Sequence, residues 1–130
     1  EHVKEKVKPN VVFTHHKNDL NIDHRITYQA VLTAFRPLLH ATIEEIYSFE
    51  VLSSTEWSYP NTFQPNVYFD ISKSIAKKVE AMKFYVSELK DWPHPRSIKG
   101  VEILAKKRGC EVGLEYAEAF ECIRIVRRGL

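Results

Sequence analysis

The sequence has few cysteines, no long apolar run and no large excess of charge of either sign. Its two cysteines, Cys110 and Cys122, cannot build a disulfide framework, which favours a reducing compartment and a cytoplasmic location. No apolar stretch approaches the roughly 18 residues that a membrane-spanning helix needs. With 19 basic and 17 acidic residues the net charge is +2, so we expect neither nucleic acid nor a membrane as a partner.

What the chain does contain is the balance of an ordinary soluble globular domain. Its 130 residues include 44% hydrophobic and 28% charged residues, enough to bury a real core. We find no internal repeat and no low-complexity segment, which predicts a single domain over residues 1–130. The first residues, EHVKEKVKPN, have no signal-peptide core and resemble the end of a charged helix. This start predicts that the chain is a portion of something longer.

Hydrophobic patterns predict alternating strands and helices. Strands are expected over 11–16, 43–53, 66–71 and 120–127, and helices over 1–8, 23–36, 72–90 and 97–108. The first strand should be buried, the second should have one wetter face, and residues 116–119 should form a loop. The order strand, helix, strand predicts an α/β domain with some parallel pairing.

Several residues are expected to begin, end or bury these elements. Ser72 and Ser97 are predicted helix caps, and Gly109 is a predicted C-terminal stop. The inward faces are predicted to hold Ala30, Val31, Ala34 and Phe35 in the first long helix and Ile75, Val79, Met82, Val86 and Leu89 in the second. Both cysteines are expected to be buried thiols.

The densest polar cluster is THHKNDLNIDHR at 14–25, with three His, two Asp, two Asn and one Arg. It lies where a predicted strand ends and a helix begins, the usual place of a site in an α/β sheet. His24 would stand in the first helical turn, where the helix dipole keeps an imidazole neutral and able to bind a metal ion. Asp19 and Asp23 could orient a ligand. An equally open interpretation is a capped helix start, with Asp19 or Asn21 as the cap and the histidines solvated.

Three further segments carry weaker signals. In HPRS at 94–97, His94 and Arg96 stand on a stiff loop before a helix, an arrangement suited to an anion, although a simple helix-entry turn is favoured two to one on composition. In EYAEAF at 115–120, Tyr116 and Glu118 could reach a site, or belong to the core and the surface. The aromatic loop 54–66 could cover a sugar or a nucleotide, and a packing role is equally open.

Taken together in order, four segments resemble the PIG-L or LmbE-like family of zinc-dependent N-deacetylases. NVVFTHHKNDLNIDHR is similar to that family's second signature, in which a strand and a polar loop precede an (H/N)-x-D-H motif that opens a helix. NVYFDISKSIAKKVEAMKFYVSE, HPRSIKGVEILAKKRG and GLEYAEAFECIRI resemble its following segments. The version found here looks closest to bacterial members that act on sugar-linked substrates.

The resemblance implies a fold, a reaction and a cofactor. The fold would be the C-terminal part of a Rossmann-like, three-layer α/β fold with a mixed or parallel sheet. The reaction would be removal of the N-acetyl group from an N-acetylglucosamine moiety by an enzyme that binds Zn²⁺. Zinc lowers the pKa of water to about 7 and polarises the amide oxygen, so a carboxylate can take the proton. The substrate would be an N-acetylated sugar or a sugar nucleotide.

Individual roles follow from the matched positions. His24 matches the third zinc ligand, and Asp23 matches the motif aspartate beside it, which would orient a ligand. Arg25 would support the loop or contact substrate. Asn21 takes a place where many members have His, and an amide cannot titrate, so an acid role would pass to His94 or His16. His94, Arg96, Tyr116 and Glu118 become candidate substrate-binding residues.

One departure from the family decides what this chain could do alone. The N-terminal HPDDE-type motif, which would supply two zinc ligands and the general base, has no match in this sequence. We therefore expect the chain to match only the C-terminal portion of the family and to be inactive alone. Two alternatives stay open: a non-catalytic deacetylase-like domain that binds a sugar nucleotide or a protein partner, and a fragment whose exposed sheet edge drives association into a homo-oligomer.

Overall fold

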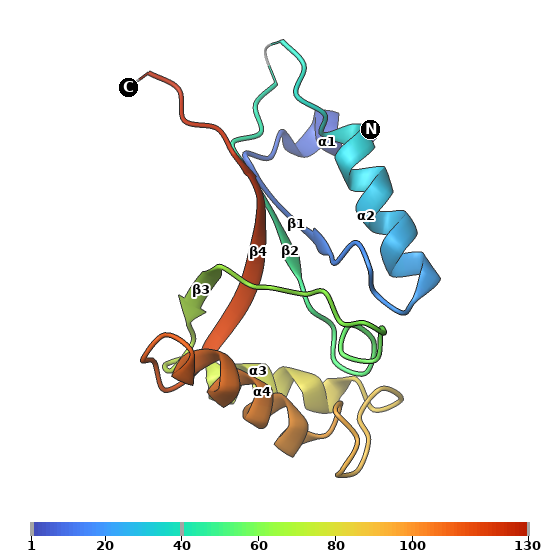
Figure 1. The fold of residues 1–130 in the computed structure, drawn as a ribbon, viewed down its shortest axis with the longest axis vertical. Coiled ribbons are helices and arrows are strands. Elements are labelled where there is room, and N and C mark those ends of the chain that lie inside the picture. The colour runs from blue at the N-terminus through green and yellow to red at the C-terminus, as the bar shows by residue number, and fades with distance from the viewer. Residues whose placement is uncertain (1, 40, 130) are drawn as a thin grey trace. The chain divides into compact units, whose positions relative to one another are not determined.

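A computed structural model describes residues 2–39 and 41–129 of the chain. The elements are α1 (His2–Val7), β1 (Val11–His15), α2 (Ile22–Ala34), β2 (Glu45–Phe49), β3 (Val67–Asp70), α3 (Ile75–Phe84), α4 (Ile98–Cys110) and β4 (Ala117–Ile125) (Figure 1). The strands form one mixed sheet in the order β1-β2-β4-β3. β1 pairs with β2 in parallel, and β2 pairs with β4 antiparallel. The predicted α/β class with a mixed sheet is therefore confirmed. No helix within the described residues is long and apolar enough to cross a membrane.

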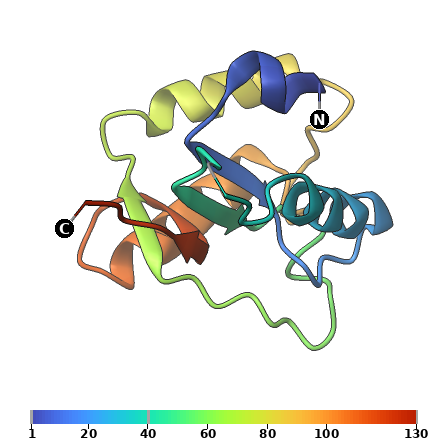
Figure 2. The same cartoon turned by 90° about the horizontal axis from the view of Figure 1, so that it is seen from above.

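The chain divides into two compact units. The first contains residues up to 65 and from 120 onward, and the second contains residues 66–119. In the first unit α2 lies beside the parallel pair of β1 and β2 (Figure 1 and Figure 2). In the second unit α3 packs on α4.

β2 is the most deeply buried strand, and it is buried on both faces. Ile46, Tyr47 and Ser48 are consecutive residues, so their side chains alternate between the faces, yet all three are at most 5% exposed. β1 and β4 flank the strand on either side. The prediction of one wetter face was therefore wrong for this strand, because strand alternation alone does not say what covers the second face.

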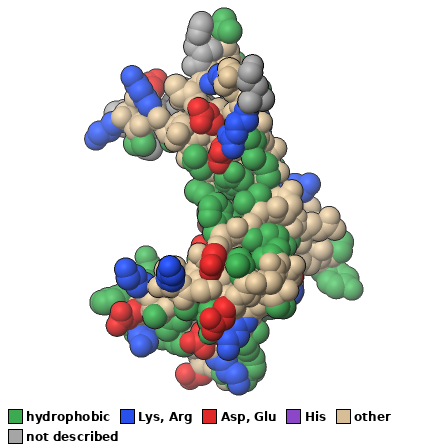
Figure 3. Space-filling view, turned by 90° about the vertical axis from the view of Figure 1, so that its left-hand side faces the viewer, with side chains coloured by type: hydrophobic (Ala, Val, Ile, Leu, Met, Phe, Trp, Pro, Cys, Tyr) green, Lys and Arg blue, Asp and Glu red, His purple; other side chains and the backbone are tan. Residues whose placement is uncertain are grey.

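β1 and α2 are more exposed than the sequence predicts. Phe13 is 47% exposed, and α2 contains no buried residue. Of its predicted inward face, Val31, Ala34 and Phe35 are half-buried and Ala30 is exposed. Leu20, Ile22 and Ile26 are also more than half exposed. Hydrophobic side chains also reach the surface among charged ones on the face shown in Figure 3, which is the side away from α2. β1 stands at one end of the strand order, as the alternative of an exposed sheet edge requires.

In the second unit, α4 follows the sequence prediction and α3 does not. The Ser97 side chain accepts a hydrogen bond from the Gly100 N–H at 3.0 Å and caps α4, as predicted. α3 ends at Phe84, so Val86 and Leu89 lie beyond it, and Val86 is 79% exposed. The predicted helix over 72–90 was too long at both ends. A stripe of apolar residues continues past the point where the chain leaves the helix.

Other details of the second unit and the last strand also correct the sequence prediction. Ser72 donates its hydroxyl hydrogen to Asp70 and lies before the N-cap of α3, which is Ser74. Gly109 lies inside α4, which ends at Cys110, and it is Gly113, beyond the helix, that takes the left-handed conformation with φ of 75°. β4 begins at Ala117, so part of the predicted loop 116–119 is strand. Cys110 is exposed and Cys122 is half-buried, so neither is a fully buried thiol.

Tyr47 is expected to ionise well above the ordinary range of a tyrosine. Its hydroxyl donates to Glu45 at 2.6 Å, and this bond, together with burial and the negative charge of Glu45, raises the pKa of Tyr47 to about 12. Because the folded pKa is raised, the stabilisation is fully present below the unfolded pKa near 10 and is lost as pH rises through about 12. An ultraviolet titration of tyrosinate should show a late component near pH 12 that Tyr47→Phe reduces, while Tyr28, whose pKa burial and Glu121 also raise, still ionises late. Complete ionisation of all tyrosines near pH 10 would contradict this assignment.

Candidate functional site

The polar cluster of the sequence forms the loop between β1 and α2 and the first turn of α2. Asn21 is the N-cap, since its backbone is extended and its side-chain oxygen accepts from the Asp23 N–H at 2.9 Å. Of the two predicted caps, the structure therefore selects Asn21. His24 lies in the first turn of α2, as predicted.

Asp19 is the centre of this site. Its side chain is fully buried, and its carboxylate accepts hydrogen bonds from the Ser54 hydroxyl, from the Thr55 hydroxyl at 2.6 Å and from the Asn21 N–H at 2.9 Å. His24 Nδ1 lies 3.0 Å from Asp19 Oδ1. Burial raises the pKa of Asp19, but the hydrogen bonds and the neighbouring His24 outweigh burial and hold the pKa below its ordinary value. Asp19 is therefore an ionised carboxylate at neutral pH.

The contact with Asp19 defines the tautomer of His24. An ionised carboxylate can only accept hydrogen bonds, so Nδ1 of a neutral His24 carries the hydrogen and donates it. The other ring nitrogen, Nε2, keeps its lone pair and is the one open to a metal ion. A histidine that donates one ring N–H to a carboxylate and offers the other nitrogen is the usual arrangement of a zinc ligand.

His15 packs directly against His24. Their rings are stacked, with centroids 4.1 Å apart and an interplanar angle of 20°, and the ring of Phe49 tilts against His15 at 4.8 Å. Burial and the adjacent His24 lower the pKa of His15, which Asp19 partly offsets. His15 is thus neutral at neutral pH and packs as a flat side chain, which limits how far the His24 ring can turn.

His16 belongs to a separate buried cluster. It is 1% exposed, with Nδ1 2.8 Å from Glu121 Oε2 and Nε2 3.2 Å from the Thr62 hydroxyl. Ser48 and the Gln64 N–H also donate to Glu121. Both ring nitrogens of His16 are therefore engaged by other side chains of the first unit.

His16 and Asp19 have the His-x-x-Asp spacing of the metal pair in an HPDDE-type motif, although the other residues of that motif are absent around them. Their side chains bind different partners, however, and they do not form a pair. Among the described residues, no group of three or more His, Cys, Asp or Glu side chains is placed to hold a metal ion. A metal ion bound at His24 would therefore need further ligands from outside these residues.

Arg25 and Asp23 have roles that the sequence left open. The Arg25 guanidinium donates to the carbonyl oxygens of Asp19 at 2.7 Å and Leu20 at 2.8 Å, so it braces the loop. Asp23 is exposed, and its backbone N–H is bound by Asn21. The carboxylate that hydrogen-bonds His24 is that of Asp19, whereas the resemblance assigned the orienting role to Asp23.

The aromatic loop contains both buried and exposed aromatic side chains. Phe63 is buried and its ring meets His16 edge-on at 5.3 Å, so it packs in the core. Tyr59 is fully exposed. Ser54 and Thr55 lie at the start of this loop, and sequence reasoning missed both. Their only signal is a pair of hydroxyl residues soon after a strand, which is too common to single out.

The remaining candidate residues belong to the second unit, and two of them form ion pairs there. Arg96 forms an ion pair with Glu88, and Glu118 forms one with Lys78. His94 Nδ1 accepts from the Arg96 N–H at 3.1 Å, and Ser97 caps α4. This segment is therefore a helix-entry turn, the interpretation that composition favoured, and its arginine has a carboxylate partner.

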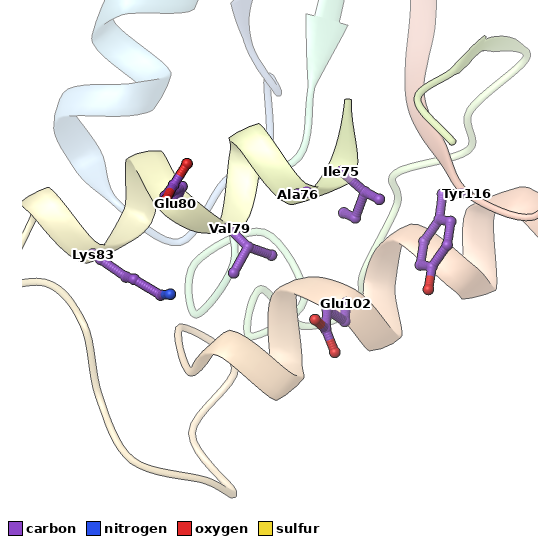
Figure 4. A pocket seen from close by; sticks show the side chains of 7 residues that line it. All are labelled: Ile75, Ala76, Val79, Glu80, Lys83, Glu102 and Tyr116. Atoms are coloured by element: carbon purple, nitrogen blue, oxygen red, sulfur yellow. The ribbon is translucent and has the colours of Figure 1, made fainter. Parts of the chain in front are cut away.

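Tyr116 lines an open hollow between α3 and α4 (Figure 4). The hollow has a volume of about 390 Å³ and is lined by Ile75, Ala76, Val79, Glu80, Lys83, Glu102 and Tyr116. Lys106 Nζ lies 5.6 Å from the centroid of the Tyr116 ring. Ile75 and Val79, which the sequence assigned to the core, line this hollow.

Comparison with known proteins supports the fold and no more. No family model and no curated protein matches the chain. Among solved structures, the chain is similar to the conserved protein TT1542 from Thermus thermophilus, with a TM-score of 0.71 and 20% identity. The similarity covers 98% of this chain and 57% of that protein. The chain thus has the α/β fold of a part of TT1542 and spans little more than half of its length.

Proposed function

We propose that this chain is the C-terminal portion of a zinc-dependent hydrolase that removes the N-acetyl group from an N-acetylglucosamine-type sugar conjugate. The observation that carries the proposal is the contact between His24 Nδ1 and the buried, ionised carboxylate of Asp19. This contact prepares Nε2 as a metal ligand in the way that zinc-binding histidines are usually prepared. The four ordered segments that resemble the PIG-L or LmbE-like family supply the reaction and the substrate class.

The donor set fits zinc in part. A catalytic zinc ion takes three protein ligands, and this chain offers the imidazole of His24. The other two ligands and the general base would come from an HPDDE-type motif in a longer protein, which the span of 57% of TT1542 accommodates. When bound, zinc would lower the pKa of a water molecule and polarise the amide oxygen.

The residues of this chain would position groups around that chemistry. Asp19 holds the His24 ring, and Arg25 braces the loop that carries Asp19. The side-chain oxygen of Asn21 is used by the helix cap, so its amide NH₂ is the part left to donate to a substrate oxygen. Asp23 is an exposed carboxylate beside His24.

A non-catalytic function is the second candidate. It is favoured by the lack of a three-ligand metal group within residues 2–39 and 41–129, and by Asn21, which cannot titrate. In that case the same loop would belong to a domain that binds a sugar nucleotide or a protein partner.

Acetate release separates the two candidates. The longer protein that contains this chain is incubated with an N-acetylglucosamine-type conjugate, first as purified, then after chelation, and then after zinc is added back. We expect acetate release that chelation abolishes and zinc restores. Tight binding of the sugar without any release of acetate would favour the non-catalytic domain, and release that survives chelation would contradict the zinc mechanism.

A further inference from the structure

The turn after β2 is built around two buried hydroxyl groups. Ser54 is 8% exposed and Thr55 is 1% exposed. Thr55 Oγ1 accepts from the Val51 N–H at 2.7 Å, and the backbone N–H of Thr55 donates to the Val51 carbonyl at 2.9 Å. The carboxylate of Glu56 accepts from the Ser53 and Ser54 N–H groups. The turn is therefore held by its own hydrogen bonds, and its hydroxyl groups are fixed in place.

Both hydroxyl groups point their hydrogens at Asp19. Ser54 donates to Oδ1, and Thr55 donates to Oδ2 at 2.6 Å. The backbone adds one more bond between the same segments, from the Leu20 N–H to the Ser54 carbonyl at 3.4 Å. With one donor on each oxygen, the carboxylate plane of Asp19 cannot rotate freely about its side-chain bond.

The same Oδ1 atom that accepts from Ser54 also faces His24 Nδ1 at 3.0 Å. A carboxylate oxygen can accept more than one hydrogen bond, so the two contacts are compatible. Because Asp19 is fully buried, losing one of its hydrogen-bond donors costs free energy that water cannot restore. The direction in which Asp19 holds the His24 ring is thus set from a turn that lies 35 residues further along the sequence.

We propose that Ser54 and Thr55 are positioning residues of the His24 site. They fix the Asp19 carboxylate so that His24 is kept as the Nδ1–H tautomer, with Nε2 open to a metal ion. The metal part of this inference rests on the proposed function. The tautomer part concerns the metal-free protein and stands without it.

The first experiment measures the tautomer. Nitrogen-15 chemical shifts of the His24 ring are recorded in the metal-free protein about two pH units above the ordinary histidine pKa, where a free imidazole is neutral. We expect the Nδ1–H form in the wild type and a larger share of the Nε2–H form in Ser54→Ala and Thr55→Val. Thr55→Ser keeps the hydroxyl and should restore the wild-type spectrum, which separates positioning from packing.

The second experiment measures the affinity for zinc ions, by competition with a chromophoric chelator, in the longer protein. We expect Ser54→Ala and Thr55→Val to weaken zinc binding by about 10- to 100-fold, the usual effect of losing support behind a ligand. Matched controls are Ser87→Ala and Thr33→Val, which change exposed residues. Circular dichroism of each variant verifies that the protein is folded.

The outcomes of these experiments distinguish the positioning role of Ser54 and Thr55 from the proposed zinc-dependent function. An unchanged tautomer and unchanged zinc affinity in the folded Ser54→Ala and Thr55→Val variants would overturn the inference. A changed tautomer, together with zinc binding that His24→Ala does not affect, would support the positioning of His24 and overturn the metal function.

Discussion

Asp19→Ala should lower the free energy of unfolding by about 2–6 kcal/mol, because each of two buried hydroxyl groups left without an acceptor costs about 1–3 kcal/mol. The carboxylate is fully buried and accepts four hydrogen bonds. Its removal leaves the buried hydroxyls of Ser54 and Thr55 without their acceptor. Urea unfolding of the wild type and the variant measures the difference.

Two further variants test whether the burial of Asp19 causes the large loss of stability. Asp23→Ala removes a neighbouring carboxylate that is exposed, and should cost less than about 1 kcal/mol, the value of a charge at a helix start. Asp19→Asn keeps the shape but loses the charge, so its loss should lie between those of the two alanine variants. Equal losses for Asp19→Ala and Asp23→Ala would contradict the central place of Asp19.

Acidification should lower the stability of the protein by protonating the Asp19 carboxylate. Since the pKa of Asp19 is lowered in the folded protein, its stabilising contribution is present above the unfolded carboxyl pKa near 4 and is lost as pH falls through the folded pKa. The wild type should therefore lose more stability on acidification than Asp19→Asn.

The elements that sequence predicts well are those with a local cause. Ser97 caps α4 through a bond to a residue three positions on, and Pro37 follows α2, so both helices are placed within a few residues. The burial of β2 has no local cause, because it depends on β1 and β4, which come from distant parts of the chain. The exposed face of α2 shows the converse, since an apolar stripe does not reveal whether anything covers it.

The candidate site also contains residues that a local pattern predicts and residues that it does not. His24 at the start of a helix can be predicted from a motif of a few residues. Asp23 is adjacent to His24 in α2, and consecutive helical residues point about 100° apart, so a motif neighbour is a poor hydrogen-bond partner. Asp19 precedes the helix, and its loop can fold the carboxylate back onto the ring. The contacts of Asp19 with Ser54 and Thr55 join segments 35 and 36 residues apart, and no local pattern predicts them.

Replacing His24 should abolish catalysis and zinc binding together if the proposed function holds. In the longer protein, His24→Ala removes the nitrogen that would bind zinc. Losing only the hydrogen-bond partner of a ligand typically costs about 10- to 100-fold, so acetate release should fall by more than that. His24 is only partly buried, with 20% of its side chain exposed, and Asp19 keeps its other three donors when the ring is removed, so the fold should survive.

The matched control is Gln29→Ala, which truncates an exposed side chain on the same helix and should leave both activity and zinc content unchanged. Zinc content is measured on the same preparations as acetate release, because a loss of activity alone could follow from a change at the substrate. If His24→Ala keeps its zinc and its activity, His24 is not a ligand, and the contact with Asp19 is then only a buried support for the start of α2. A parallel loss of both, with Gln29→Ala intact, ties the chemistry to the one imidazole nitrogen that Asp19 leaves open.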